Sequence, residues 1–170
     1  MTCSSAMARW FALESADAAY FDTAPHVFRY TKHYDAPPEQ VWESLESDAS
    51  ISAWGPVVKT VTWTSPRPFD VGTTREVAPP GGLAKMRERF FRWDEGQGYS
   101  FYVYESSAPM FRRFVEDYVL APDGDGTLFT WTLALEPKSA LRLPFKALAP
   151  VLKAGFGRIP ADGQKYFATR

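Results

Sequence analysis

Two acidic residues in predicted strands are the strongest candidates for chemistry. In segment 83–93, Glu88 alternates with Met86 and Phe90, so strand geometry places these three side chains on one face. The basic side chains of the other face prefer water, which predicts that Glu88 points inward. Burial would raise the pKa of its carboxyl and make it a general acid or base, whereas an arginine partner would lower that pKa. Glu88 is therefore either a proton-transfer group or one half of a salt bridge, with Arg113 or a neighbouring strand as the partner.

The second acidic residue lies in segment 113–120. We expect Phe114, Glu116 and Tyr118 to face inward there. The opposite register would exchange Glu116 for Asp117. An acidic side chain therefore faces inward in either case.

Aromatic residues accompany these carboxyls. In segment 99–105 we favour Tyr102 and Tyr104 as inward-facing residues, and in segment 127–135 we favour Phe129 and Trp131. A tyrosine beside a ligand can donate a hydrogen bond to a carbonyl while stacking on a ring, although an ordinary core tyrosine is equally consistent with the pattern.

These residues need elements that position them. Segment 26–34 is typical of a strand. Two short helices are predicted next, one that follows the helix-start residues 35–39 and one within segment 47–54. Six further strands are predicted at 57–64, 72–77, 83–93, 99–105, 113–120 and 127–135. Short loops rich in Gly and Pro join them, which favours antiparallel neighbours.

The last segment changes period and predicts a long helix. Its apolar residues recur every three or four positions along one face: Leu141, Phe145, Leu148, Leu152, Phe156 and Ile159. Because proline breaks helices, we expect an interruption near Pro160.

Residues 1–25 form an extension to a domain at 26–170. Met7, Trp10, Phe11 and Leu13 could form one face of a short helix that packs outside this domain. Attachment to a membrane surface is the alternative, but the acidic residues of the segment argue against it.

Composition excludes several classes of protein. The 170 residues carry 19 basic and 20 acidic side chains, a balance that gives no electrostatic case for a nucleic-acid binder. Cys3 is the single cysteine, so we expect no disulfide. His26 and His33 have no cysteine or carboxylate at the spacing of metal ligands, so we expect no metal site. We also expect no cofactor. Without a spanning or signal segment we expect a cytoplasmic protein, as a monomer or homodimer.

The predicted order of strands and helices implies an α+β fold with an internal cavity. A curved seven-stranded antiparallel sheet wrapped around one C-terminal helix is not filled by that helix alone. Such an arrangement favours a pocket between helix and sheet.

The sequence resembles the START-like helix-grip (SRPBCC) superfamily and, within it, the polyketide cyclase/dehydrase-type proteins. The resemblance covers about residues 26–168 and is carried by segments 36–45, 52–58, 70–73, 87–90 and 124–131, followed by the terminal helix. It implies a helix-grip fold, on which relatives serve as cyclases, lipid carriers, hormone receptors or regulators.

The leading interpretation is a protein that binds a small hydrophobic, aromatic or polycyclic molecule. We assign as ligand-binding residues Trp54, Met86, Phe90, Tyr104, Phe114, Glu116, Tyr118, Phe129, Trp131, Leu148 and Leu152. One alternative is a cyclase or dehydratase in which Glu88 and Tyr102 transfer protons. Another is a regulatory or stress-linked interaction protein that uses the basic sheet face around Arg87.

Overall fold

The computed structural model describes residues 9–82 and 84–170. The domain begins with β2 (His26–Tyr34), followed by α2 (Pro38–Glu46) and a 3-10 helix (Ser50–Ala53). Six strands follow: β3 (Thr60–Trp63), β4 (Thr74–Ala78), β5 (Met86–Asp94), β6 (Gly98–Ser106), β7 (Phe111–Asp123) and β8 (Gly126–Pro137). Helices α3 (Arg142–Phe156) and α4 (Arg158–Phe167) complete the chain, with short 3-10 turns at Pro80–Gly82 and Ser139–Leu141.

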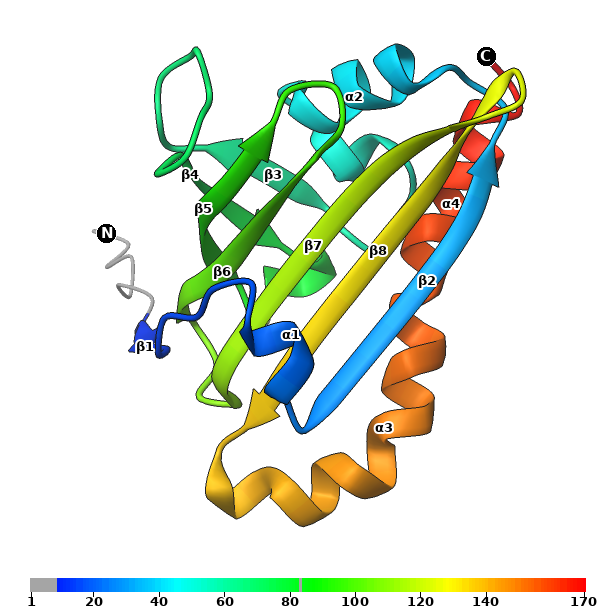
Figure 1. Cartoon of the computed structure of the whole chain (residues 1–170). Coiled ribbons are helices and arrows are strands. Elements are labelled where there is room, and N and C mark those ends of the chain that lie inside the picture. The colour runs from blue at the N-terminus through cyan, green and yellow to red at the C-terminus, as the bar shows by residue number, and fades with distance from the viewer. Residues whose placement is uncertain (1–8, 83) are drawn as a thin grey trace, which may run out of the picture.

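The strands form one curved antiparallel sheet in the order β2-β8-β7-β6-β5-β4-β3 (Figure 1). The long pair β2–β8 runs in unbroken register from His26 opposite Leu135 to Tyr34 opposite Thr127. This is the expected α+β helix-grip architecture, with two short helices after the first long strand.

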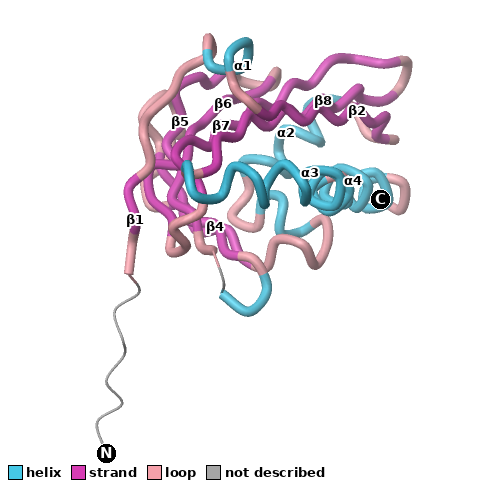
Figure 2. Tube along the Cα trace, turned by 90° about the horizontal axis from the view of Figure 1, so that it is seen from below, coloured by secondary structure: helices cyan, strands magenta, loops and turns pink. Residues whose placement is uncertain are grey.

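Helices α3 and α4 cover one face of the sheet, whereas the short helix α1 (Tyr20–Thr23) lies on the other (Figure 2). The break expected near Pro160 is present, and it lies at Gly157 between the two helices. Pro160 instead lies in the first turn of α4, where a missing backbone N–H costs no hydrogen bond.

Aromatic rings dominate the core between sheet and helices. Five of them form a continuous column of stacked neighbours, with ring centroids 5.1–5.8 Å apart: Trp131, Tyr118, Phe129, Tyr34 and Phe167. The column runs from β7 and β8 through β2 to the end of α4. It joins the sheet to the C-terminal helix.

The N-terminal segment packs against the sheet as a strand. Strand β1 (Phe11–Ala12) pairs with Ser106 and Glu105 of β6, so the expected helical face over Trp10–Leu13 is wrong and Met7 lies outside the described residues. β7 pairs with β6 only from Gly98 to Tyr102, so β1 occupies the side of β6 that β7 leaves open beyond Tyr102. Helix α1 is the helical part of the extension.

Within the described residues, no helix combines the length and apolar character needed to cross a bilayer.

Candidate functional site

An interior cavity of about 170 Å³ lies between the sheet and the junction of α3 and α4. Its lining is apolar apart from two carboxyls, one phenol and one indole N–H, and consists of Ile51, Val57, Val58, Val77, Pro79, Ala84, Met86, Glu88, Phe114, Glu116, Tyr118, Trp131, Phe156 and Ile159. An apolar chamber with a few convergent polar groups is typical of a site for a small organic molecule.

Glu116 of β7 supplies the first polar group. Its Oε2 accepts hydrogen bonds from Tyr118 Oη at 2.9 Å and from Trp131 Nε1 at 2.8 Å. Burial, reinforced by the nearby Glu88 carboxylate, raises the pKa of Glu116 to about 8, so the carboxyl is mostly protonated at neutral pH. Since both donors occupy Oε2, Oε1 is left to carry the proton, and it has no hydrogen-bond partner among the described residues.

Glu88 of β5 is held in a different state by Arg75 of β4. Arg75 Nε donates to Glu88 Oε2 at 2.5 Å, and both side chains are almost completely buried. Burial works to lower the pKa of Arg75, but the Glu88 carboxylate, with smaller contributions from Tyr99 and Tyr118, raises that pKa overall. Burial raises the pKa of Glu88, and the guanidinium opposes this shift. The salt-bridge interpretation of Glu88 therefore describes the structure, with Arg75 and not Arg113 as the partner.

Four aromatic rings surround the Arg75 guanidinium. Its central carbon lies 4.8–5.6 Å from the ring centroids of Trp63, Phe90, Tyr99 and Phe101. Nη1 donates weakly to Ser50 Oγ and Tyr99 Oη, and buried Nη2 has no hydrogen-bond partner within the described chain. Attraction between the cation and the rings replaces part of the lost hydration. Sequence reasoning missed Arg75, whose burial depends on partners from neighbouring strands.

The cavity brings together about half of the residues expected at the site. Its lining includes Met86, Glu88, Phe114, Glu116, Tyr118 and Trp131. Four others are partly or fully buried but pack into the core outside that lining: Trp54, Phe90, Phe129 and Leu152. Trp54, for example, packs edge-on against Phe129 and donates to Ser44 Oγ at 2.9 Å.

The expectation that Tyr102 and Tyr104 face inward is wrong. The inward face of β6 instead carries three buried residues: Tyr99, Phe101 and Val103. Tyr102 is paired with exposed Arg89, whose guanidinium lies 5.1 Å from the Tyr104 ring centroid on the outer face. Tyr102 and Glu88 therefore lie on opposite faces of the sheet, so their expected partnership in proton transfer has no geometric basis.

Leu148 is also misplaced by the helical pattern, because 54% of it is exposed. Helix α3 contacts the core through other residues: Phe145, Ala149, Leu152 and Phe156. The reason is that α3 carries apolar side chains on more than one face, so a period of three or four residues cannot identify the buried one.

The basic side chains of the outer sheet face are largely neutralised. Arg87 lies 2.8 Å from Glu105 and 3.3 Å from Glu76, and Arg92 lies 2.7 Å from Asp117. Ion pairs of this density leave little excess charge to attract a polyanion.

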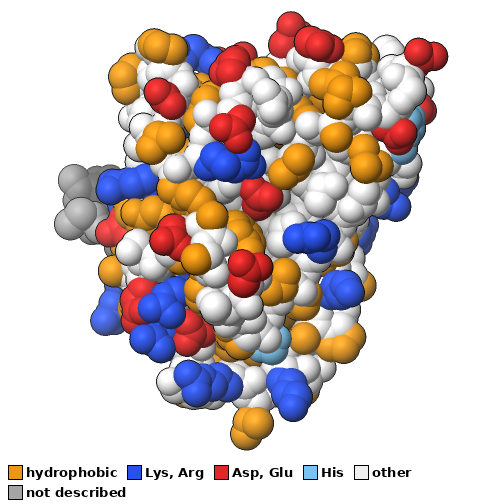
Figure 3. Space-filling model, in the orientation of Figure 1, with side chains coloured by type: hydrophobic (Ala, Val, Ile, Leu, Met, Phe, Trp, Pro, Cys, Tyr) orange, Lys and Arg blue, Asp and Glu red, His pale blue; other side chains and the backbone are white. Residues whose placement is uncertain are grey.

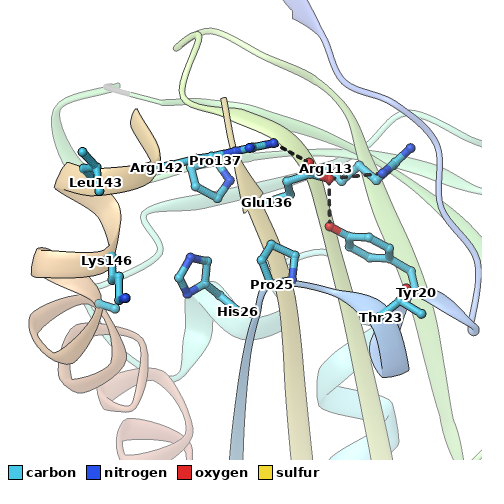
Figure 4. Close-up of a pocket in the computed structure, with 11 residues that line it drawn as sticks. Tyr20, Thr23, Pro25, His26, Arg113, Glu136, Pro137, Arg142, Leu143 and Lys146 are labelled. Atoms are coloured by element: carbon cyan, nitrogen blue, oxygen red, sulfur yellow. Dashed lines mark hydrogen bonds and ion pairs between the residues drawn. The ribbon is translucent and has the colours of Figure 1, made fainter. Parts of the chain in front are cut away.

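A second, more open pocket of about 930 Å³ lies between α1 and the beginning of α3, where β2 begins and β8 ends (Figure 4). Glu136 is its central acidic group: Tyr20 Oη lies 3.3 Å away, and Arg113 and Arg142 lie 3.1 and 3.8 Å away. Lys146 and His26 line the opposite side. This pocket combines these polar groups with apolar walls, and it shares no lining residue with the interior cavity.

Among the described residues, no three His, Cys, Asp or Glu side chains are grouped so as to hold a metal ion.

Comparison with known families agrees with the geometry. The family model for polyketide cyclase/dehydrase and lipid transport proteins matches residues 25–162. The chain belongs to this family. It is also 32% identical over 157 residues to uncharacterized proteins of Mycobacterium tuberculosis and Mycobacterium bovis, covering 92% of this chain and 93% of each relative.

Solved structures of this fold are similar at low sequence identity. A Thermus thermophilus protein superposes with a TM-score of 0.69 at 17% identity, over 85% of this chain and 98% of that one. A Streptomyces aromatase/cyclase gives 0.65 at 15% identity, over 84% and 90% of the two chains. A major latex-like protein of Panax ginseng gives 0.63 at 15% identity, over 84% and 97%. These likenesses establish the helix-grip fold of the family member.

Proposed function

We propose that the protein binds a compact, hydrophobic molecule bearing a carbonyl oxygen in the interior cavity. Membership of a polyketide cyclase and lipid-transport family supports a hydrophobic ligand. The single observation that carries the finer proposal is the buried Glu116 carboxyl, whose pKa of about 8 keeps a hydrogen-bond donor in an apolar chamber at neutral pH.

The size of the chamber limits the ligand. Its 170 Å³ is below the range of about 300–1,000 Å³ that is typical of pockets for drug-sized molecules. A ligand therefore places a compact apolar part, such as one or two fused rings, among the lining residues. Stacking on the walls and one hydrogen bond from Glu116 Oε1 would fix its orientation.

Two neutral probes test the carbonyl preference. α-Tetralone and tetralin have nearly the same shape, but only the former has a carbonyl oxygen. Calorimetric titration near pH 6 should give a Kd for α-tetralone that is about fivefold lower, as expected for one net hydrogen bond of about 1 kcal/mol. This preference should disappear above pH 8, as Glu116 loses the donated proton.

Glu116→Gln is the decisive variant. The amide oxygen can accept from Tyr118 and Trp131 while the amide N–H₂ faces the chamber, so the preference should persist and become independent of pH. Asp117→Asn, on the outer face beside Arg92, is the matched control and should behave as the unmodified protein. Equal affinity for the two probes at low pH would overturn the carbonyl assignment, and failure of both to bind would overturn the cavity proposal.

A cyclase or dehydratase remains the second candidate, and one observation favours it. A carboxyl with a pKa of about 8, hydrogen-bonded to Tyr118, is well matched to general acid–base catalysis near neutral pH. Incubation with a linear poly-β-ketone should then give a cyclised product that Glu116→Gln no longer forms, although the variant still binds α-tetralone. Unchanged turnover by the variant would exclude this role.

A further inference from the structure

Helix α3 exposes an apolar face in addition to the one that packs on the sheet. Three of its large aliphatic residues are strongly exposed: Leu143 at 81%, Val151 at 68% and Leu148 at 54%. Since each residue turns the helix by about 100°, these three side chains fall within an arc of roughly 140° around the helix axis. The other residues of this arc are also uncharged. These are Pro144, Ala147, Ala154 and Gly155. A helix on the surface of a domain normally places polar residues on such a face.

The same segment is strongly basic. Residues 138–161 contain five cations and no acidic residue: Lys138, Arg142, Lys146, Lys153 and Arg158. This leaves 14 of the 19 basic residues against all 20 acidic residues in the rest of the chain, a charge of −6. Among the described residues, Arg142 has an ion pair, at 3.8 Å from Glu136, and the other four have no carboxylate within 4.0 Å. Figure 3 shows hydrophobic side chains between basic ones at the lower edge, where α3 begins in Figure 1.

We propose that α3 docks on the surface of an anionic phospholipid membrane. Exposed Leu143, Leu148 and Val151 would enter the boundary between headgroups and acyl chains, and the cations would contact lipid phosphates. An aliphatic arc with Lys146, Lys153 and Arg142 on its Leu143 side, about 60–100° beyond that edge at about 100° per residue, is the composition of a helix that lies in this interface. The proposal concerns the outer face of α3 and does not depend on what occupies the interior cavity.

Charge and composition disfavour a second copy of the chain, or another protein, as the partner of this face. In a two-fold dimer through α3, each copy would present the same five cations to the other, and these would repel. Protein interfaces are enriched in aromatic residues and depleted in Lys. The exposed arc has no aromatic residue, and Lys146 and Lys153 border it.

The surface pocket in Figure 4 extends the docking face. Arg142, Leu143 and Lys146 of α3 line it, together with His26. A lipid headgroup phosphate at the start of α3 would therefore find cations at the mouth of a concave site. The far end of the helix reaches Phe156, which lines the interior cavity. Docking along α3 places that cavity close to the bilayer.

Flotation with lipid vesicles tests the proposal. The full chain should float with vesicles of phosphatidylcholine and phosphatidylglycerol at roughly three to one, should not float with phosphatidylcholine alone, and should be released as salt rises. Removing two charges with Lys146→Gln and Lys153→Gln should weaken binding about 30-fold. Leu143→Ser with Val151→Ser should weaken it more than about tenfold, because two apolar side chains no longer enter the interface.

Matched variants remove exposed groups away from α3. Lys59→Gln with Lys165→Gln removes the same charge, and Val71→Ser removes an aliphatic side chain that is 62% exposed. Both should leave vesicle binding unchanged. The proposal would be overturned if vesicle binding did not depend on lipid charge, or if it fell as much in these control variants as in the α3 variants. So would a Leu143→Ser/Val151→Ser protein that changes oligomeric state in size-exclusion chromatography but still binds vesicles, since that result assigns the face to a second copy.

Discussion

Two carboxyls that share one chamber are driven to different protonation states by their neighbours. Glu88 faces a guanidinium at 2.5 Å, whereas Glu116 faces a phenol and an indole that are both neutral. Neutral donors compensate less of the cost of burying a charge than a cation does. The result is one ion pair and one neutral acid in the same apolar space.

The raised pKa of Glu116 predicts how stability depends on pH. The folded protein holds the proton up to about pH 8, whereas the unfolded chain releases it near 4.5, so the stability from this group is full below pH 4.5 and is lost as pH rises to 8. Glu116→Gln cannot release a proton. Relative to this variant, the unfolding free energy of the unmodified protein should fall by up to about 1.4 kcal/mol per pH unit in that window.

Urea unfolding of both proteins at several pH values measures this difference. A constant difference between pH 5 and about 8 would show that Glu116 is ionised in the folded protein, contrary to the expected direction.

The buried ion pair makes a separate prediction. Arg75→Leu leaves the Glu88 carboxylate buried without a partner and should lower the unfolding free energy by about 3–5 kcal/mol. Replacing both residues by Leu removes the unpaired charge as well. The double variant should therefore be more stable than Arg75→Leu alone in urea unfolding, and a double variant that is less stable would contradict the account.

At the scale of elements, two glycines of the C-terminal helices differ in the space that a side chain would find around them. A Cβ on Gly163 of α4 would lie 2.6 Å from Tyr34 Oη and 2.8 Å from Trp54, both buried residues. A Cβ on Gly155 of α3 would meet nothing within 4 Å. Gly163 is therefore packed tightly against Tyr34 of β2 and against Trp54, and Gly155 lies on the open face.

Alanine at these two positions should change stability in opposite directions. Gly155→Ala should stabilise the protein by about 0.5–1 kcal/mol through helix propensity. Gly163→Ala gains the same propensity but pushes α4 against packed rings, and should destabilise by about 1–3 kcal/mol. Thermal unfolding of the two variants measures both effects. Stabilisation by Gly163→Ala would show that the helix moves away from the sheet without cost.

The order of the elements was predictable, because periods of two and of three to four residues are properties of the sequence itself. Strand faces were predictable only where the ladder is regular. β5 and β6 are offset at two bulges, one between Arg87 and Glu88 and one between Phe90 and Arg92. The second bulge returns Trp93 to the inward face with Phe90, although alternation predicts the outer face.

Site residues were predictable where their own strand was regular, as for Glu116 and Trp131. Arg75 could not be identified in this way. Its burial depends on Glu88 and on aromatic rings from three other strands, which only tertiary packing brings together. A single arginine in a short strand carries no local sign of such partners.

At the scale of the whole molecule, the N-terminal extension is an addition to a sheet that is already complete. Leu13 N donates to Tyr104 O and Glu14 N donates to Arg112 O, both at 2.9 Å, and Tyr20 Oη donates to Glu136. Glu14 also forms ion pairs with Arg112 and Arg113, at 2.7 and 2.5 Å, and β1 pairs with β6, so the extension is held at several points along its length.

Residues 26–170 form the seven strands β2 to β8 and the helices that cover them, so we predict that removal of residues 1–24 leaves the fold intact. The loss of these hydrogen bonds and of the largely exposed Glu14 ion pairs should lower the unfolding free energy by roughly 2–6 kcal/mol. Circular dichroism and denaturant unfolding measure the two effects. A shortened chain without cooperative unfolding would show that the extension is part of the folding unit.

The five-ring column has a consequence for spectroscopy. Trp131 and Tyr118 form part of the chamber wall, and Phe167 lies at the opposite end of the same stack, near the C-terminus. Each ring shields or deshields the protons of the next through its ring current. A ligand that tilts the Trp131 indole should therefore shift the NMR resonances of the Phe167 ring. This shift would report from a distance that the cavity is occupied, without an added label.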